Sequence, residues 1–304
     1  MSLSLFGIMR GGSSVVTDVF FKVAIAGGLP YVDPVTELYD QGVEIHSLLV
    51  QEKTEWALAQ NNNSVIGIFR ELPNWVWSNS FKNCKKVLII RDPRDCLVSL
   101  FHIRKKHSLT LDQSNNIPNG FNIDQIDHFS LVYQKYFRER FDAYLEFLAC
   151  FPDILVIRYE DIIDNFGGFL ELVISLLADQ GGDVDAMRTE ASVIASTVSM
   201  VKRNASNDGA HNRSGKSMQF ISELKIETIR ELTRTFSTHL SFFCYRSNVI
   251  NFDKSFLFSR DDNEQVTSRL DYLIDFNRIL AAENGARIEE IRQLKEQINL
   301  LRAC

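Results

Sequence analysis

The chain has 304 residues, of which 45% are hydrophobic and 24% charged, as in an ordinary globular protein. Its net charge of -6 excludes a nucleic-acid-binding protein whose whole surface is basic, although a local basic pocket is compatible with it. No apolar run reaches the length of a membrane span and no signal peptide is visible, so we expect a cytoplasmic protein without a membrane span. Five widely spaced cysteines without a Cys-x-x-Cys pair predict no zinc or redox site and favour a reducing compartment.

The first predicted unit is a strand over 3–9, a turn rich in glycine and serine, and a helix over 15–26. The turn consists of Arg10, Gly11, Gly12, Ser13 and Ser14, and the helix begins at Val15. N–H groups at a helix start are unpaired, and glycine permits close backbone approach, so this turn is a candidate phosphate cradle. A tight turn without a ligand is the other interpretation.

A helix over 43–60 and a second strand over 64–69 are predicted next, separated by three asparagines. Glu71 follows the end of this second strand. The second strand is expected to lie beside the first, which would place the Glu71 carboxylate near the candidate phosphate cradle. Trp75 and Trp77 come next, and packing in the core is favoured for them over stacking on a ligand.

The most informative segment is the apolar run Val87–Ile90 with the residues that follow it. A short run rich in β-branched residues predicts a strand buried on both faces, as in parallel sheets. Arg91 ends this strand, and Ser99 lies eight residues later on a predicted helix. These two side chains can hold one phosphate from two sides. The alternative is a surface arginine that pairs with Asp92 or Asp95.

The second half predicts an irregular loop over 108–125, a helix over 127–150 with a buried aromatic face, and a strand over 154–157. Tyr159 and Glu160 follow that strand. Helices are predicted over 167–178, 186–201 and 221–240, and the polar segment 204–216 reads as a loop. This loop contains Arg213, Ser214 and Gly215.

Heptad spacing of apolar residues begins at Leu270 and predicts a coiled coil within residues 265–304. Such a tail would make the chain a homo-oligomer. Asn284 and Arg287 occupy core positions of the heptads and weaken the middle of the seam. A C-terminal helix that folds back onto the body of the protein is the alternative.

Four of these features, in this order, resemble the sulfotransferases that use 3′-phosphoadenosine-5′-phosphosulfate (PAPS). The turn at 10–14 resembles the loop that binds the 5′-phosphosulfate of the donor. Arg91 and Ser99 match the arginine and serine that hold the 3′-phosphate, and Tyr159 matches a tyrosine that contacts the adenine. The segment 213–215 partly matches the loop that closes over the 3′-phosphate, with Ser214 in place of a lysine.

The resemblance covers about residues 3–245 and implies an α/β fold with a central parallel sheet flanked by helices, of the P-loop-like sulfotransferase type. It implies a PAPS-binding domain over 1–250, followed by the tail at 265–304. Arg10 stands where cytosolic members have lysine, which is closer to the carbohydrate and tyrosyl-protein branches. Glu71 stands where cytosolic members have the histidine base. The implied reaction moves a sulfuryl group from PAPS, without a metal, to a hydroxyl or amine on a small molecule or carbohydrate.

Two other functions stay open from the sequence. One is a nucleotide or small-molecule kinase, against which the missing lysine and hydroxyl residue after the turn count. The other is a non-catalytic scaffold that binds a nucleotide and assembles through its tail. For the base, His102 is the second candidate after Glu71.

Overall fold

The computed structural model describes residues 2–39, 42, 48–60, 63–78, 81, 84–107, 125–151, 153–204 and 218–245. The chain forms two compact units, Met1–Ala143 with Ile154–Ser247, and Tyr144–Asp153 with Asn248–Cys304. The sheet and the candidate site belong to the first unit. The predicted loop residues at 213–215 and the predicted coiled coil at 265–304 lie outside the described residues.

A parallel sheet forms the centre of the first unit, and within the described residues its strand order is β2-β3-β1-β4-β5. The strands are β1 (Leu3–Gly7), β2 (Tyr31–Val32), β3 (Val65–Phe69), β4 (Lys85–Ile90) and β5 (Leu155–Arg158). β1 and β3 are buried along their whole length, as is typical of central strands in a parallel sheet, and in β1 this includes the polar Ser4. The predicted parallel sheet is therefore confirmed. The two-residue edge strand β2 was not predicted, because no apolar run marks it in the sequence.

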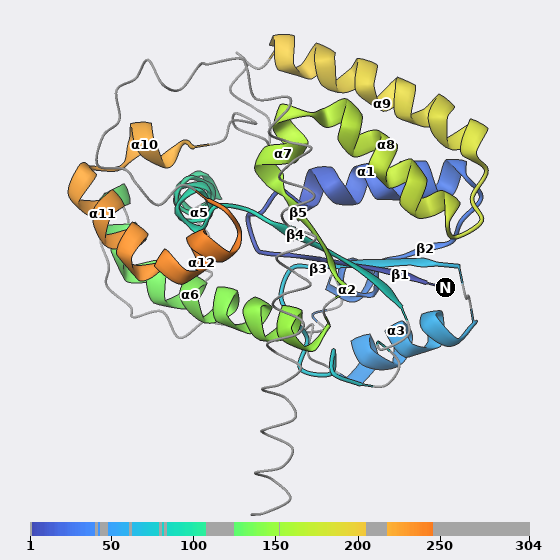
Figure 1. Ribbon diagram of the computed structural model, residues 1–304, viewed down its shortest axis with the longest axis horizontal. Coiled ribbons are helices and arrows are strands. Elements are labelled where there is room, and N and C mark those ends of the chain that lie inside the picture. The colour runs from blue at the N-terminus through green and yellow to red at the C-terminus, as the bar shows by residue number, and fades with distance from the viewer. Residues whose placement is uncertain are drawn as a thin grey trace, which may run out of the picture. The chain divides into compact units, whose positions relative to one another are not determined.

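The helices, shown in Figure 1, mostly follow the predicted order. They are α1 (Ser13–Ala26), α2 (Pro34–Tyr39), α3 (Leu48–Gln60), α5 (Pro93–His107), α6 (Ile126–Cys150), α7 (Tyr159–Asp164), α8 (Phe166–Ala178), α9 (Val184–Asn204), α10 (Phe220–Glu223), α11 (Ile226–Thr235) and α12 (Ser237–Phe242). The single helix predicted over 221–240 is wrong, because it is three short helices. The backbone is extended at Leu224 and Lys225, and Asp127 accepts the Lys225 N–H at 2.8 Å, which stabilises the break.

The two faces of the sheet carry different cores. Leu5 of β1 and Ile89 of β4 pack in one apolar cluster with residues of α1, α8 and α9, and Figure 1 shows these helices layered on one side of the sheet. On the other face, rings from β1, β3 and the segment after β3 contact one another at centroid distances of 5.4–6.3 Å; they are Phe6, Phe69, Trp75 and Phe81. Trp75 is thus a core residue, as the sequence favoured, whereas Trp77 is 42% exposed.

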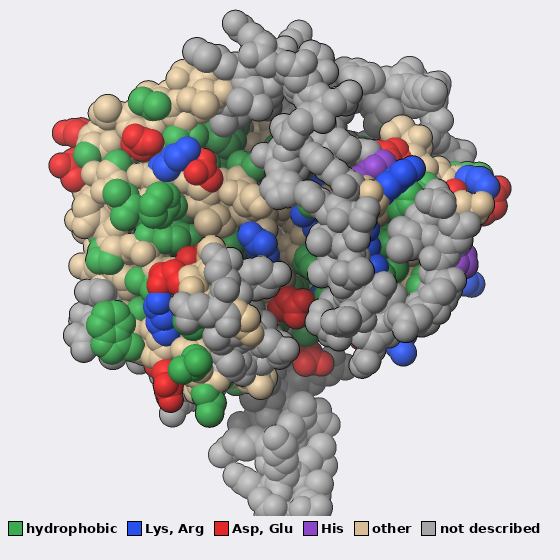
Figure 2. Space-filling model, turned by 180° about the vertical axis from the view of Figure 1, so that it is seen from behind, with side chains coloured by type: hydrophobic (Ala, Val, Ile, Leu, Met, Phe, Trp, Pro, Cys, Tyr) green, Lys and Arg blue, Asp and Glu red, His purple; other side chains and the backbone are tan. Residues whose placement is uncertain are grey.

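The described residues on the face shown in Figure 2 include side chains of all kinds. Figure 2 shows acidic and basic side chains close together near the middle of the view, with apolar ones distributed among them. Large apolar side chains that remain exposed include Phe21 and Ile25 of α1 and Trp56 of α3. None of the described helices is long and apolar enough to cross a membrane.

The order of the strands brings the candidate residues together. Parallel strands end at one edge of the sheet, and in open α/β sheets ligands bind at that edge, next to the strand where the order reverses. β1 is such a strand, because β3 lies on one side of it and β4 on the other. The turn at 10–14, Glu71, Arg91 and Tyr159 follow β1, β3, β4 and β5, respectively.

Candidate active site

The turn after β1 leaves the start of α1 open toward the edge of the sheet. The Gly11 N–H donates to the Ile8 carbonyl at 2.9 Å, and Arg10 and Gly12 adopt positive φ angles of 67° and 86°. Gly12 is the N-cap of α1, and no side chain among the described residues caps it. Backbone N–H groups arranged in this way form an anion-binding concavity. The N–H of Val15 already donates to the Gly12 carbonyl at 3.1 Å. Val15 would therefore help to shape the turn and would not bind an anion through this N–H.

Gly12 also allows the turn to pack against the end of β5. A Cβ atom at Gly12 would lie 2.1 Å from Cδ2 of Tyr159, so the tyrosine ring occupies the space that any other side chain would need. The Arg91 guanidinium carbon lies 4.7 Å from the centroid of the same ring. Burial raises the pKa of Tyr159, so this phenol stays neutral near neutral pH. The Tyr159 ring, which follows β5, therefore packs against both the turn after β1 and Arg91 at the end of β4.

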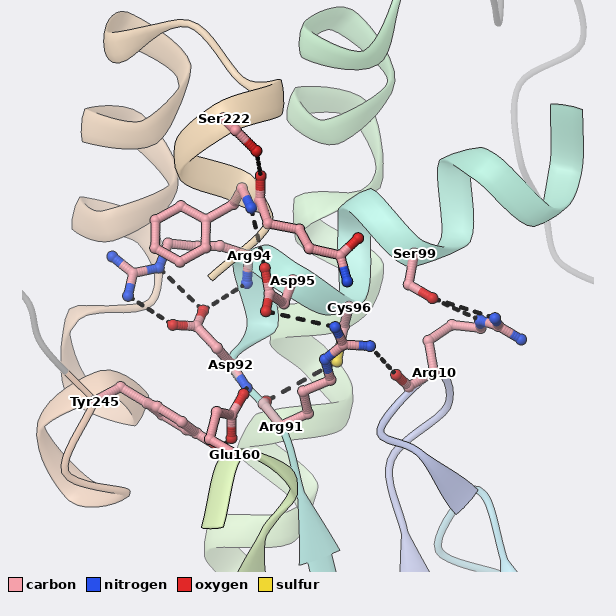
Figure 3. A network of polar contacts seen from close by, with 12 residues as sticks. Arg10, Arg91, Asp92, Arg94, Asp95, Cys96, Ser99, Glu160, Ser222 and Tyr245 are labelled. Carbon is pink, nitrogen blue, oxygen red and sulfur yellow. Dashed lines mark hydrogen bonds and ion pairs between the residues drawn. The ribbon is translucent and has the colours of Figure 1, made fainter. Parts of the chain in front are cut away.

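Arg10 joins the turn at 10–14 to α5. Its Nε and Nη2 atoms each donate to Ser99 Oγ at 3.2 Å, and Arg91 Nη1 donates to the Arg10 carbonyl at 3.2 Å (Figure 3). Burial lowers the pKa of Arg10, and the nearby charges of Arg91 and Arg70 act in the same direction. The sequence spacing predicted that Arg91 and Ser99 act as a pair. In the structure both contact Arg10, Ser99 through the Arg10 side chain and Arg91 through the Arg10 carbonyl.

Arg91 is a buried residue, only 5% exposed, and its ion pair is with Asp95 at 3.4 Å. The alternative of a surface pair between Arg91 and Asp95 is wrong in its location, because the pair forms in the protein interior. Burial disfavours the charged guanidinium of Arg91, but Asp95 and other neighbours outweigh it, so its pKa is raised. Burial raises the pKa of Asp95 to about 6, and Arg91 opposes this rise. Asp92 is engaged elsewhere, in an ion pair with Arg94 at 2.6 Å.

Glu160, the second residue after β5, links the ends of β4 and β5. Its carboxylate accepts from the Asp92 N–H at 3.2 Å and from the Tyr245 hydroxyl at 3.0 Å. Burial raises its pKa to about 7, with a further contribution from the charge of Asp92. The network in Figure 3 thus fixes the backbone next to Arg91.

Glu71 and His102, the two candidate bases, have different surroundings. Glu71 Oε1 accepts from Arg140 Nη2 at 2.8 Å and from the Tyr136 hydroxyl at 3.3 Å, both on α6. His102 pairs with Glu223 of α10. Within the described residues the arginine that forms an ion pair with Glu71 is Arg140, and not Arg10 of the turn. No group of three or more histidine, cysteine, aspartate or glutamate side chains within the described part of the chain is placed to hold a metal.

The chain belongs to the sulfotransferase domain family, whose model matches residues 34–243. Among solved structures it is similar to that of mouse sulfotransferase SULT7A1 complexed with PAP, with 19% identity, a TM-score of 0.52, and coverage of 79% of this chain and 84% of that one. A structure of retinol dehydratase in a complex with retinol and PAP covers 83% of each chain at 14% identity, with a TM-score of 0.47. No curated protein matches the sequence.

The family match confirms the sulfotransferase domain, and the mouse structure confirms an α/β fold with a central parallel sheet flanked by helices. The matched range begins after β1 and the turn at 10–14. β1 nevertheless lies between β3 and β4 in the sheet, with Leu3 opposite both Val65 and Lys85. The N-terminal segment is therefore an integral part of the domain.

Proposed function

We propose that the chain transfers a sulfuryl group from PAPS to an acceptor hydroxyl or amine. The observation that carries this proposal is the convergence of Arg10, Arg91 and Ser99 beside the uncapped start of α1, at the edge where the parallel strands end. Two guanidinium groups, a hydroxyl and open N–H groups suit a ligand with two separated phosphate groups.

The donor would lie across the ends of β1, β4 and β5. The turn at 10–14, with the start of α1, would hold the 5′-phosphosulfate, and Arg91 with Ser99 would hold the 3′-phosphate. Tyr159 would border the adenine. The mouse protein of similar fold is complexed with PAP, which supports a PAPS site here. Arg213, Ser214 and Gly215, outside the described residues, would complete the 3′-phosphate site.

In the reaction, the acceptor oxygen or nitrogen forms a bond to sulfur while the bond from sulfur to the 5′-phosphate oxygen breaks. Arg10 and the α1 N–H groups would stabilise the negative charge that develops on the leaving phosphate. Glu71 would take the proton that the acceptor loses. The products are the sulfated acceptor and adenosine 3′,5′-bisphosphate (PAP).

For the acceptor we propose a carbohydrate, on the grounds that Arg10 and Glu71 resemble the carbohydrate and tyrosyl-protein branches of the family. The proposal extends to a nucleotide-binding domain over 1–250 and an oligomer formed through 265–304. These last two points depend on sequence patterns alone.

The test is turnover of PAPS with a panel of mono- and disaccharides, amino sugars and tyrosine peptides. Mass spectrometry would measure both PAP and the sulfated product, and ATP with Mg²⁺ would serve as the competing donor. We expect equal amounts of PAP and sulfated product. Transfer of phosphate from ATP, or preferential binding of ATP over PAP, would contradict the proposal.

A further inference from the structure

Glu71 is held by α6, a helix that contributes none of the residues predicted for the donor site. Arg140 Nη2 donates to Glu71 Oε1 at 2.8 Å, and Arg140 Nε and the Tyr136 hydroxyl donate to the same oxygen at 3.3 Å each. Within the described residues, every hydrogen bond to this carboxylate therefore goes to Oε1.

The two α6 side chains are themselves fixed. The Arg140 guanidinium carbon lies 3.3 Å from the centroid of the Tyr136 ring, and Arg140 Nη1 donates to the Tyr136 carbonyl at 3.4 Å. The residues are four apart, so they lie on the same side of the helix. The side chains of Arg140 and Glu71 are 20% and 30% exposed, so solvent screens this pair less than one on the surface.

Burial, with the adjacent Glu71 carboxylate, raises the pKa of Tyr136. The phenol consequently stays protonated at neutral pH and donates its hydrogen bond to Glu71. Stacking, a backbone hydrogen bond and three hydrogen bonds from two side chains to one oxygen together define the direction of the Glu71 side chain.

We propose that Tyr136 and Arg140 are positioning residues that bind Oε1 of Glu71 and direct Oε2 toward the acceptor proton. The inference rests on the proposed function, because it assigns Glu71 as the base of that reaction. A base that holds its orientation before the acceptor binds does not have to find it during the reaction. If the ion pair served only the stability of the fold, substitution of Arg140 would have the same effect on the rate whether or not residue 71 can act as a base.

The experiment measures single-turnover rates of sulfuryl transfer from bound PAPS to the best acceptor of the panel above, with PAP affinity measured by calorimetry. We expect Arg140→Gln to lower the rate by about tenfold to a hundredfold, as misorientation of a reacting group does, and to leave PAP affinity within about twofold. Arg140→Lys should recover part of the rate. Tyr136→Phe, which keeps the ring under Arg140, should lower the rate several-fold and keeps the test valid if Arg140→Gln does not fold.

The decisive comparison repeats Arg140→Gln in a Glu71→Gln background. If Arg140 acts only through Glu71, the second substitution should change the remaining rate by less than about twofold. Equal effects of Arg140→Gln in both backgrounds would overturn the inference. The matched control is Arg138→Gln on the same helix, whose side chain is 58% exposed and faces Asp142; it should leave the rate unchanged.

The outcomes separate the two proposals. If the wild-type protein transfers no sulfuryl group to any acceptor, the proposed function fails and the role of α6 fails with it. If the wild-type protein is active but Arg140→Gln and Tyr136→Phe both turn over normally, only the positioning role fails.

Discussion

Gly12→Ala tests the packing that joins the turn at 10–14 to the end of β5. At a φ of 86° the added methyl group would lie 2.1 Å from Cδ2 and 2.3 Å from Cε2 of Tyr159. The left-handed backbone costs a non-glycine residue about 1 kcal/mol. Moving a buried ring to relieve the overlap costs about 1–3 kcal/mol more. We therefore expect the free energy of unfolding to fall by about 2–4 kcal/mol.

Urea denaturation would measure this loss, with Gly28→Ala as the matched control. Gly28 has a φ of 74°, and an added Cβ would meet nothing within 4 Å, so only the backbone cost of about 1 kcal/mol applies. In a Tyr159→Ala background, the cost of Gly12→Ala should fall to that of the control. The reasoning would be refuted if Gly12→Ala and Gly28→Ala cost the same in the wild-type background.

Three further predictions address the charges, the serine and the tail. Because burial raises the pKa of Glu160 to about 7 in the folded protein, its contribution to stability is present at low pH and is lost as the pH rises through about 7. The expected loss in the free energy of unfolding is on the order of 2 kcal/mol between about pH 5 and about pH 8. Glu160→Gln should reduce this loss, as measured by urea denaturation at each pH. Ser99→Ala removes the acceptor of two Arg10 hydrogen bonds and should weaken PAP binding by about tenfold in calorimetry, and an unchanged affinity would contradict a phosphate role for Ser99. Deletion of 265–304 should convert an oligomer to a monomer that still binds PAP, and light scattering that shows an unchanged oligomer would rule out the tail.

The fold and the positions of the site residues were largely predictable because the information is local. Val87–Ile90 is a short apolar run, rich in β-branched residues and ended by a charged residue, and such a run favours a buried strand with its polar end at the edge of a sheet. The same reasoning placed Arg10, Glu71 and Tyr159 at the ends of their own strands. Their order in the sheet then brought them to one side of the protein.

The contacts between these residues were not predictable, because they depend on distant segments. The sequence left open that Arg91 pairs with Asp92 or Asp95 at the surface, but it did not show that the pair with Asp95 is buried. Arg140 lies 69 residues from Glu71 in the chain, and no spacing rule relates the two. The break at Leu224 likewise depends on Asp127, which accepts the N–H of the next residue.

The most direct test of a PAPS site is the affinity of the protein for adenosine 3′,5′-bisphosphate compared with 5′-AMP, measured by calorimetry in the wild type and in Arg91→Ala. If Arg91 reads the 3′-phosphate, the wild type should bind the bisphosphate much more tightly than AMP. The loss of a charge-assisted contact, about 2–3 kcal/mol, should weaken bisphosphate binding by more than tenfold and leave AMP binding nearly unchanged. Equal losses for both ligands, or equal affinities in the wild type, would contradict the account.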